Sequence, residues 1–142
     1  MASFTLTTAS NAAENLSGGQ VGFITANGAL VSAATAAVNM TATSILTVAG
    51  GLQGTDYGAN LVNGGQVNIS STGVVVSALS AIYATGTGQV SVTNAGTVSG
   101  GSAALNLTAD LVAVGNSGTL TGYNSTGLYV AAGPAKSSRI PA

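Results

Sequence analysis

Cysteine and histidine are absent from this sequence, and charged residues make up only 4% of its 142 positions. The absence of thiols excludes disulfide bonds and suits an extracellular protein. The absence of histidine removes the commonest general acid and base of enzymes. The acids are Glu14, Asp56 and Asp110. In the repeat described below, the two aspartates fall on different columns two rungs apart and Glu14 lies in the N-terminal cap, so the carboxylate pair of a glycoside hydrolase is not expected. We therefore expect no enzyme, no catalytic residues and no cofactor.

Basic residues are just as scarce, since Lys136 and Arg139 are the only two and the net charge is −1. Without a basic patch, no nucleic-acid binding is expected. The basic start of a conventional signal peptide is missing as well. The most apolar stretch, from Val21 to Met40, is interrupted by Thr, Asn, Gly and Ser, which argues against a transmembrane helix. We expect no membrane insertion, and an extracellular or cell-surface location reached without a conventional N-terminal signal peptide.

Apolar residues, by contrast, make up 46% of the sequence, and there are 21 glycines. So hydrophobic a chain with so little charge is not intrinsically disordered. Gly, Thr, Val, Ser and Asn are poor to middling helix formers, whereas Val and Thr suit a pleated strand. The length is that of one domain with a real core. The composition therefore predicts a single all-β domain.

Apolar residues recur about every 23 positions. Two inward columns are predicted early in each repeat, at Phe23, Leu46, Ile69, Val92 and Val114, and at Ala29, Leu52, Val75, Val98 and Leu120. Two more follow, at Ala36, Ala59, Ile82, Leu105 and Leu128, and at Val38, Leu61, Ala84, Leu107 and Val130. Such a period, with apolar positions two apart, indicates stacked coils of strand.

The repeat predicts a parallel β-helix of about five three-strand rungs over residues 20–133. Residues 1–19 fit the frame in part and are predicted to form a partial rung or N-terminal cap. Residues 134–142, which hold both prolines, leave the pattern as an extended tail. A further column of Asn27, Gly50, Gly73, Gly96 and Gly118 marks a corner. We expect a left-handed backbone there, because glycine and asparagine adopt it most easily.

One loop has a weak metal-binding pattern. Residues 50–58 resemble a calcium-binding Gly-Gly-x-Gly-x-Asp repeat that carries one extra residue before Asp56. Calcium in such repeats lies between two successive aspartate loops, and Leu79 stands at the equivalent place in the next rung. We therefore expect no metal site, keep Asp56 as a weak candidate, and favour a corner aspartate whose carboxylate caps backbone N–H groups.

The clearest repeats read Val92-Thr-Asn-Ala-Gly-Thr-Val-Ser-Gly100 and Val114-Gly-Asn-Ser-Gly-Thr-Leu-Thr-Gly122. They resemble the Asn-x-Gly-Thr-(Ile/Val/Leu)-x-Gly repeat of bacterial secreted β-solenoids: autotransporter passenger domains, haemagglutinin-type adhesins and repeat regions of calcium-binding secreted proteins. The resemblance is sharp over residues 88–130 and looser over 20–87. It implies a parallel β-helix with an extracellular, structural or adhesive role.

The best interpretation is a non-catalytic structural subunit that stacks end to end with copies of itself into an extracellular fibre, filament or surface layer. Tyr83 and Tyr129, predicted to share one outward column, and the basic residues Lys136 and Arg139 of the tail are the expected self-association residues. One alternative is a virion or phage spike, or an adhesin-type module that binds glycan. An ice-binding protein is the third, since Thr97-x-Ser99 and Thr119-x-Thr121 form a short outward ladder.

Overall fold

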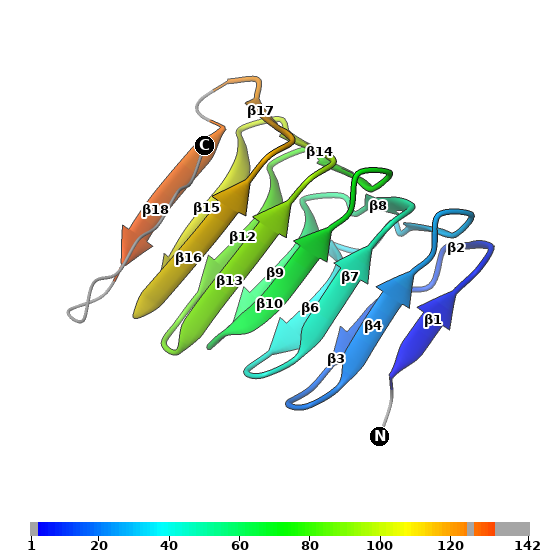
Figure 1. The fold of residues 1–142 in the computed structure, drawn as a ribbon, viewed down its shortest axis with the longest axis horizontal. Coiled ribbons are helices and arrows are strands. Elements are labelled where there is room, and N and C mark those ends of the chain that lie inside the picture. Colours follow the sequence, from blue (N-terminus) through cyan, green and yellow to red (C-terminus); the bar gives the residue numbers. More distant parts are fainter. Residues whose placement is uncertain (1–2, 125–126, 133–142) are drawn as a thin grey trace.

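The computed structural model describes residues 3–124 and 127–132. This part of the chain is all-β, with no helix, and every strand pairing in it is parallel. The strands form three six-stranded sheets. Because the chain visits the three sheets in turn, each set of three successive strands makes one rung of a β-solenoid (Figure 1). The predicted fold class is confirmed.

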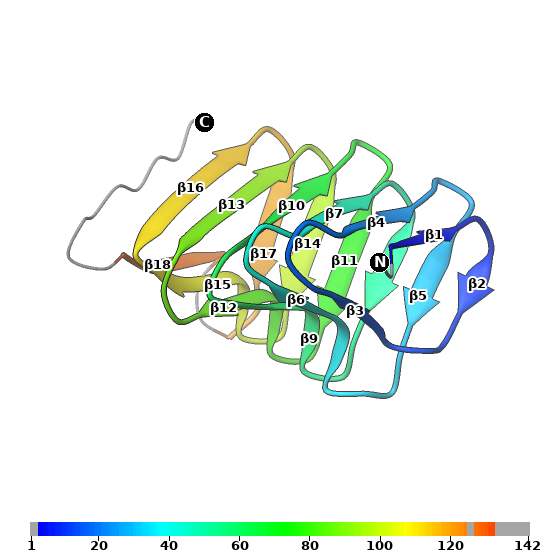
Figure 2. The same cartoon turned by 90° about the horizontal axis from the view of Figure 1, so that it is seen from below.

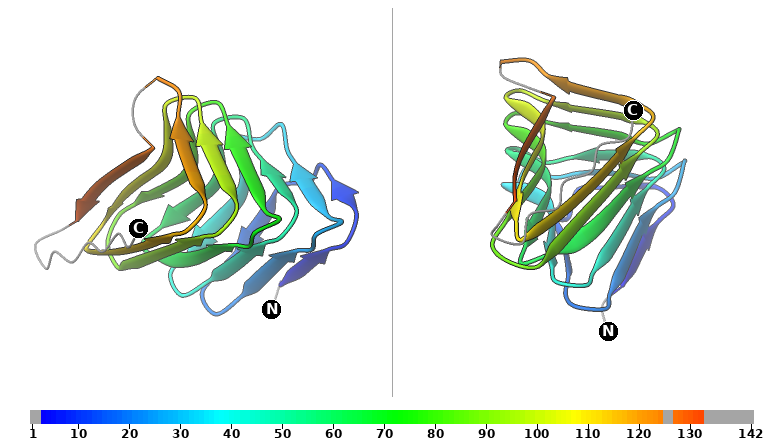
Figure 3. Two further views of the ribbon diagram at one scale, coloured as in Figure 1. Left: turned by 45° about the horizontal axis from the view of Figure 1, so that its top comes forward. Right: turned by 60° about the vertical axis from the view of Figure 1, so that its left-hand side comes forward.

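The three sheets enclose one elongated interior, as views from other sides show (Figure 2, Figure 3). Sheet 1 consists of β1 (Phe4–Leu6), β4 (Val21–Ile24), β7 (Ile45–Val48), β10 (Gly65–Ile69), β13 (Gln89–Asn94) and β16 (Leu111–Asn116). Sheet 2 consists of β2 (Ala9–Ser10), β5 (Ala29–Val31), β8 (Gly51–Gln53), β11 (Val74–Ser77), β14 (Thr97–Gly100) and β17 (Thr119–Gly122). Sheet 3 consists of β3 (Glu14–Leu16), β6 (Ala36–Thr41), β9 (Tyr57–Val62), β12 (Ser80–Thr85), β15 (Ala103–Ala109) and β18 (Leu128–Ala132).

The core is made of inward columns in which one residue from each rung stacks on the next. On sheet 2 the column runs Leu30, Leu52, Val75, Val98 and Leu120, of which the first four are at most 2% exposed. On sheet 3 two columns run Val38, Ala59, Ile82, Leu105 and Leu128, and Met40, Leu61, Ala84, Leu107 and Val130. The alternation of strand side chains thus sends one apolar set inward in every rung.

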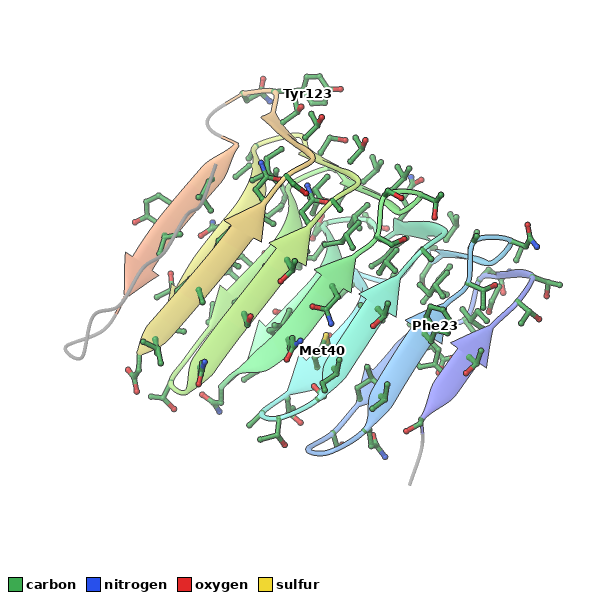
Figure 4. All side chains as sticks on the ribbon, in the orientation of Figure 1. Phe23, Met40 and Tyr123 are labelled. Atoms are coloured by element: carbon green, nitrogen blue, oxygen red, sulfur yellow. The ribbon has the colours of Figure 1, made fainter. Side chains whose placement is uncertain are left out.

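Sheet 1 departs from the predicted columns. Phe23 faces outward and is 38% exposed, while Gly22 and Ile24 face the interior (Figure 4). The inward column is Gly22, Leu46, Val67, Val92 and Val114, with steps of 24, 21, 25 and 22 residues. A constant step of 23 therefore places some residues on the wrong face, because a one-residue slip reverses the direction of a side chain. The same effect makes Leu30, in place of Ala29, the inward residue of the second rung on sheet 2. On sheet 3 the register differs by two residues, so Ala36 and Val38 are buried as predicted, but Val38 and Met40 are the residues that stack on Ala59 and Leu61.

The glycine corner between sheets 1 and 2 has a different cause from the one predicted. Its members are Gly28, Gly50, Gly73, Gly96 and Gly118, so Gly28 takes the place expected for Asn27. None of them has positive φ. A Cβ on Gly96 would instead lie 2.3 Å from the carbonyl oxygen of Gly73 in the preceding rung. These glycines are required because successive corners touch.

Left-handed residues gather at the corner between sheets 3 and 1. They are Gly19, Thr43, Asn63, Gly64, Gly65, Gly86 and Gly88, with φ between 61° and 139°. The Oδ1 atom of Asn63 accepts a hydrogen bond from the Thr87 N–H at 3.0 Å, which ties one such corner to the next. The left-handed backbone predicted for the corner between sheets 1 and 2 is therefore found at the corner between sheets 3 and 1, and in other residues.

Candidate functional site

An asparagine ladder lies inside the corner between sheets 1 and 2 at the last two rungs. Asn94 is 1% exposed, and its Oδ1 accepts the Gly96 N–H at 3.0 Å. Its Nδ2 donates to Asn116 Oδ1 at 2.9 Å and to the Thr119 carbonyl oxygen at 3.2 Å. Asn94 Nδ2 also lies 3.4 Å from the Gly96 carbonyl oxygen, and Asn116 repeats this bond by donating to the Gly118 carbonyl oxygen at 3.3 Å. The Asn-x-Gly spacing thus serves to close the turn and to bind one rung to the next.

This ladder begins where an apolar column ends. Register places Ile24, Val48 and Ile69 in line with Asn94 and Asn116. A buried amide, Asn94, and a half-buried one, Asn116, therefore replace aliphatic side chains at the C-terminal end. They bond to each other and to backbone atoms of the corner. The Asn-x-Gly motif is visible in the sequence, but the role of its asparagines is not. The recurrence of Asn exactly two residues before the corner glycine was the available signal.

The outer face of sheet 3 holds the predicted tyrosine column. Tyr83 and Tyr129 share an outward column with Asn60 and Asn106, as predicted. Tyr83, however, stacks on Tyr57, with ring centroids 4.5 Å apart and an angle of 11° between the rings. Each ring therefore covers one face of the other, and both residues are half-buried. Tyr129, which is 52% exposed on the last strand of the sheet, is the freer contact residue.

The stacked pair also has an electrostatic consequence. Burial raises the pKa of the Tyr57 hydroxyl above its usual value, and the neighbouring Tyr83 and Asp56 add to the rise. The neutral phenol is therefore favoured in the fold.

Asp56 makes its hydrogen bonds through the backbone, so the predicted capping of backbone N–H groups by its carboxylate is not found among the described residues. Its N–H donates to the Thr35 carbonyl oxygen at 2.9 Å, and its own carbonyl oxygen accepts the N–H groups of Leu79 and Ser80 at 3.2 and 3.1 Å. These bonds align Asp56 with Leu79, as the repeat predicted. No group of three or more His, Cys, Asp or Glu side chains that could hold a metal occurs among the described residues.

A hollow of about 240 Å³ opens on sheet 1, next to the corner with sheet 3, and its lining includes Thr43, Ile45, Gln66, Gln89 and Ser91. It forms because the corners differ in length. In register, five residues separate Thr85 from Ser91, whereas three separate Val62 from Gln66. The longer corner projects beyond the shorter one, and the wall that results carries hydroxyl and amide groups but no charge.

The outer face of sheet 2 is flat and uncharged. Val31, Val74 and Val76 are 50, 43 and 36% exposed there. Thr97 and Thr119 continue the column of Val74. The threonine ladder suggested by the sequence thus spans two rungs of this sheet, and valine takes its place in the rung before.

The N-terminal end of the solenoid is narrow and plugged. The strands β1, β2 and β3 have only three, two and three residues. The Phe4 ring packs over Gly22, where an added Cβ would lie 2.5 Å from it. Glu14 pairs in register with Val38, so a carboxylate stands at the mouth of an apolar column.

The C-terminal end is wide. The strands β16, β17 and β18 have six, four and five residues and are the last in their sheets within the described residues. Leu120 and Val130 are only partly buried against the core. Tyr123, which is 74% exposed, projects from the turn after β17 (Figure 4). The first and last rungs lie at opposite ends of the molecule (Figure 1).

Two of the predicted self-association residues, Lys136 and Arg139, and the tail 134–142 lie outside the described residues. Within the described ranges no helix is long and apolar enough to cross a membrane. No protein-family model, curated protein or solved structure matches the chain. The chain is thus identified by its architecture, a parallel β-solenoid.

Proposed function

We propose that the protein is a non-catalytic structural subunit that associates with copies of itself, outside the cell or at its surface, through an open edge of its solenoid. The observation that carries this proposal is the wide C-terminal edge. In a parallel ladder each residue directs its N–H and C=O groups to the same side. The N–H groups of Leu111 and Ser117 donate to the preceding rung. By alternation, Val112, Val114 and Asn116 direct theirs toward the open end.

The same alternation holds for β17. The N–H groups of Thr119 and Tyr123 donate to the carbonyl oxygens of Gly96 and Gly100. By the same alternation the Leu120 N–H points toward the C-terminal end, while its carbonyl oxygen lies beside Gly127. An edge whose backbone donors and acceptors have no partner among the described residues is a template for another strand. Proteins that remain apart usually blunt such edges with charge, and β16 and β17 carry no charged residue.

The low charge of the rest of the molecule supports self-association. Glu14, Asp56 and Asp110 are the only charged side chains within the described residues. Charge repulsion that would keep copies apart is therefore weak. The Asn-x-Gly repeats add support for an extracellular location, because they resemble those of secreted bacterial solenoids.

The proposal is tested by light scattering coupled to gel filtration, with the full-length chain studied from micromolar to millimolar concentration. We expect association that increases with concentration and persists in high salt, because backbone hydrogen bonds and apolar contacts depend little on ionic strength. A monodisperse monomer at the highest concentration would contradict it.

A second candidate function, a glycan-binding module, is favoured by the uncharged hollow on sheet 1. Amide and hydroxyl side chains such as Gln66, Gln89 and Ser91 are suitable partners for sugar hydroxyl groups. Titration calorimetry with neutral oligosaccharides would test it. Binding by the wild type that is lost in Gln89→Ala would support this function, and the absence of heat with every sugar would refute it.

A further inference from the structure

The two ends of the solenoid do not fit each other. Glu14 occupies the inward column that continues through Val38, Ala59, Ile82 and Leu105. An inward-pointing charge at the end of a sheet is a recognised block to edge pairing, because a strand added there would bury the charge. The N-terminal edge is therefore protected, and its short strands offer few backbone groups to a partner.

The C-terminal edge has neither of these features. The inward residues of its first two strands are Val112, Val114, Asn116 and Leu120, all of them uncharged. Asn94 has its amide groups satisfied by the rung that follows it. Asn116 donates only to Gly118 among the described residues. No further rung follows it there, so a partner molecule would supply the next backbone groups for its amide.

Head-to-tail stacking would bring unlike residues together. Register places Leu6 in the column of Asn116, and Glu14 in the column of Leu128. The first contact would set an apolar side chain against the end of the amide ladder. The second would bury a carboxylate within an aliphatic column, at a cost of several kcal/mol.

We propose that the C-terminal edge pairs with the C-terminal edge of a second copy, which gives a closed two-fold dimer in place of an open filament. This inference rests on the proposed function. In the dimer β16 lies antiparallel to β16 of the other copy, so that the outward N–H and C=O groups of Val112 and Val114 meet their equivalents. The two N-terminal ends, each with its Glu14, face away from the interface and stop further growth. A two-fold contact uses the same surface on both copies and closes on itself.

The experiment is sedimentation of the full-length protein and three variants over a range of concentrations. The wild type is expected to reach a dimer and grow no further. Leu120→Lys places a charge at the mouth of the C-terminal end, as Glu14 does at the other end, and should raise the dimer dissociation constant by at least about tenfold. Leu120 is only partly buried, so the rungs should stay folded. Val74→Lys adds the same charge to an exposed site in the middle of sheet 2 and should leave the dimer unchanged.

Glu14→Val removes the block at the N-terminal edge and should produce species larger than a dimer. A dimer from this variant would contradict the role of Glu14. Open-ended filaments of the wild type would overturn the two-fold pairing and leave the proposed function standing. A wild-type monomer at every concentration would overturn both. Equal dimerisation of Leu120→Lys and wild type would also overturn the pairing.

Discussion

Replacement of Gly96 by alanine tests why glycine recurs at the corner between sheets 1 and 2. The added Cβ would lie 2.3 Å from the carbonyl oxygen of Gly73 and 2.4 Å from that of Ser70. Both oxygens belong to the preceding rung and accept hydrogen bonds, from the Thr97 N–H at 3.0 Å and from the Gly73 N–H at 2.9 Å. The corner must therefore open, and these two bonds must lengthen.

The expected cost follows from two terms. Forcing extra volume into a packed site costs about 1–3 kcal/mol. Two weakened hydrogen bonds add roughly 0.5–1.5 kcal/mol each. We expect Gly96→Ala to lower the free energy of unfolding by about 2–6 kcal/mol, measured by urea denaturation followed by circular dichroism.

Gly51→Ala is the matched control, because the nearest atom to its added Cβ is the Ala29 Cβ at 3.5 Å and its φ is not positive. It should be neutral, or more stable by about 0.4–1 kcal/mol through the lower entropy of the unfolded chain. Gly96→Asn separates the two explanations, since asparagine tolerates a left-handed backbone but not a close contact. Wild-type stability in Gly96→Asn would refute the argument from close packing.

Three further predictions concern the ladder, the tyrosines and metal. Asn94→Ala should lower the free energy of unfolding by about 2–4 kcal/mol in urea denaturation, because it leaves buried backbone groups without partners. The control Asn68→Ala, on the outer face, should lower it by well under half of that. Equal losses in the two variants would contradict the role of the ladder. In an alkaline absorbance titration Tyr57 should ionise above the ordinary tyrosine pKa of about 10, and its component should vanish in Tyr57→Phe. Because its folded pKa is raised, the stability it contributes is complete below the ordinary tyrosine pKa of about 10 and is lost as pH rises through the raised value. Chelator should leave the melting temperature unchanged, and a fall that calcium reverses would restore Asp56 as a metal site.

The sequence alone predicted the architecture because the repeat is strongest where the rungs are most regular. Val75, Val98 and Leu120 stack as expected, with steps of 23 and 22 residues. Phe23 was predicted on the wrong face because the corners differ in length. A rung that is one residue longer than average is followed by one that is two residues shorter, and the average period of 23 hides both changes. A single sequence records the sum of these changes and not the corner in which each occurs.

The features that carry the functional argument were harder to predict. Glycine at position 96 could be recognised as a corner residue, but composition does not distinguish a left-handed backbone from a close contact. Glu14 was visible as one of three acids, yet its place in an inward column depends on the register of a first rung that is shorter than the others. Asn94 and Asn116 were part of a recognised motif, but their contact across rungs requires both side chains to point inward.

Amide hydrogen exchange measured by NMR as a function of protein concentration tests most directly the claim that the C-terminal edge is the assembly surface. Val114 directs its N–H group toward the open C-terminal end. Thr5 directs its own toward the N-terminal end, because the carbonyl oxygen of its neighbour Leu6 accepts the Thr25 N–H of the next rung. We expect exchange at Val114 to slow as concentration rises and exchange at Thr5 to stay fast. Exchange at Val114 that does not depend on concentration, or equal protection of Thr5, would contradict the account.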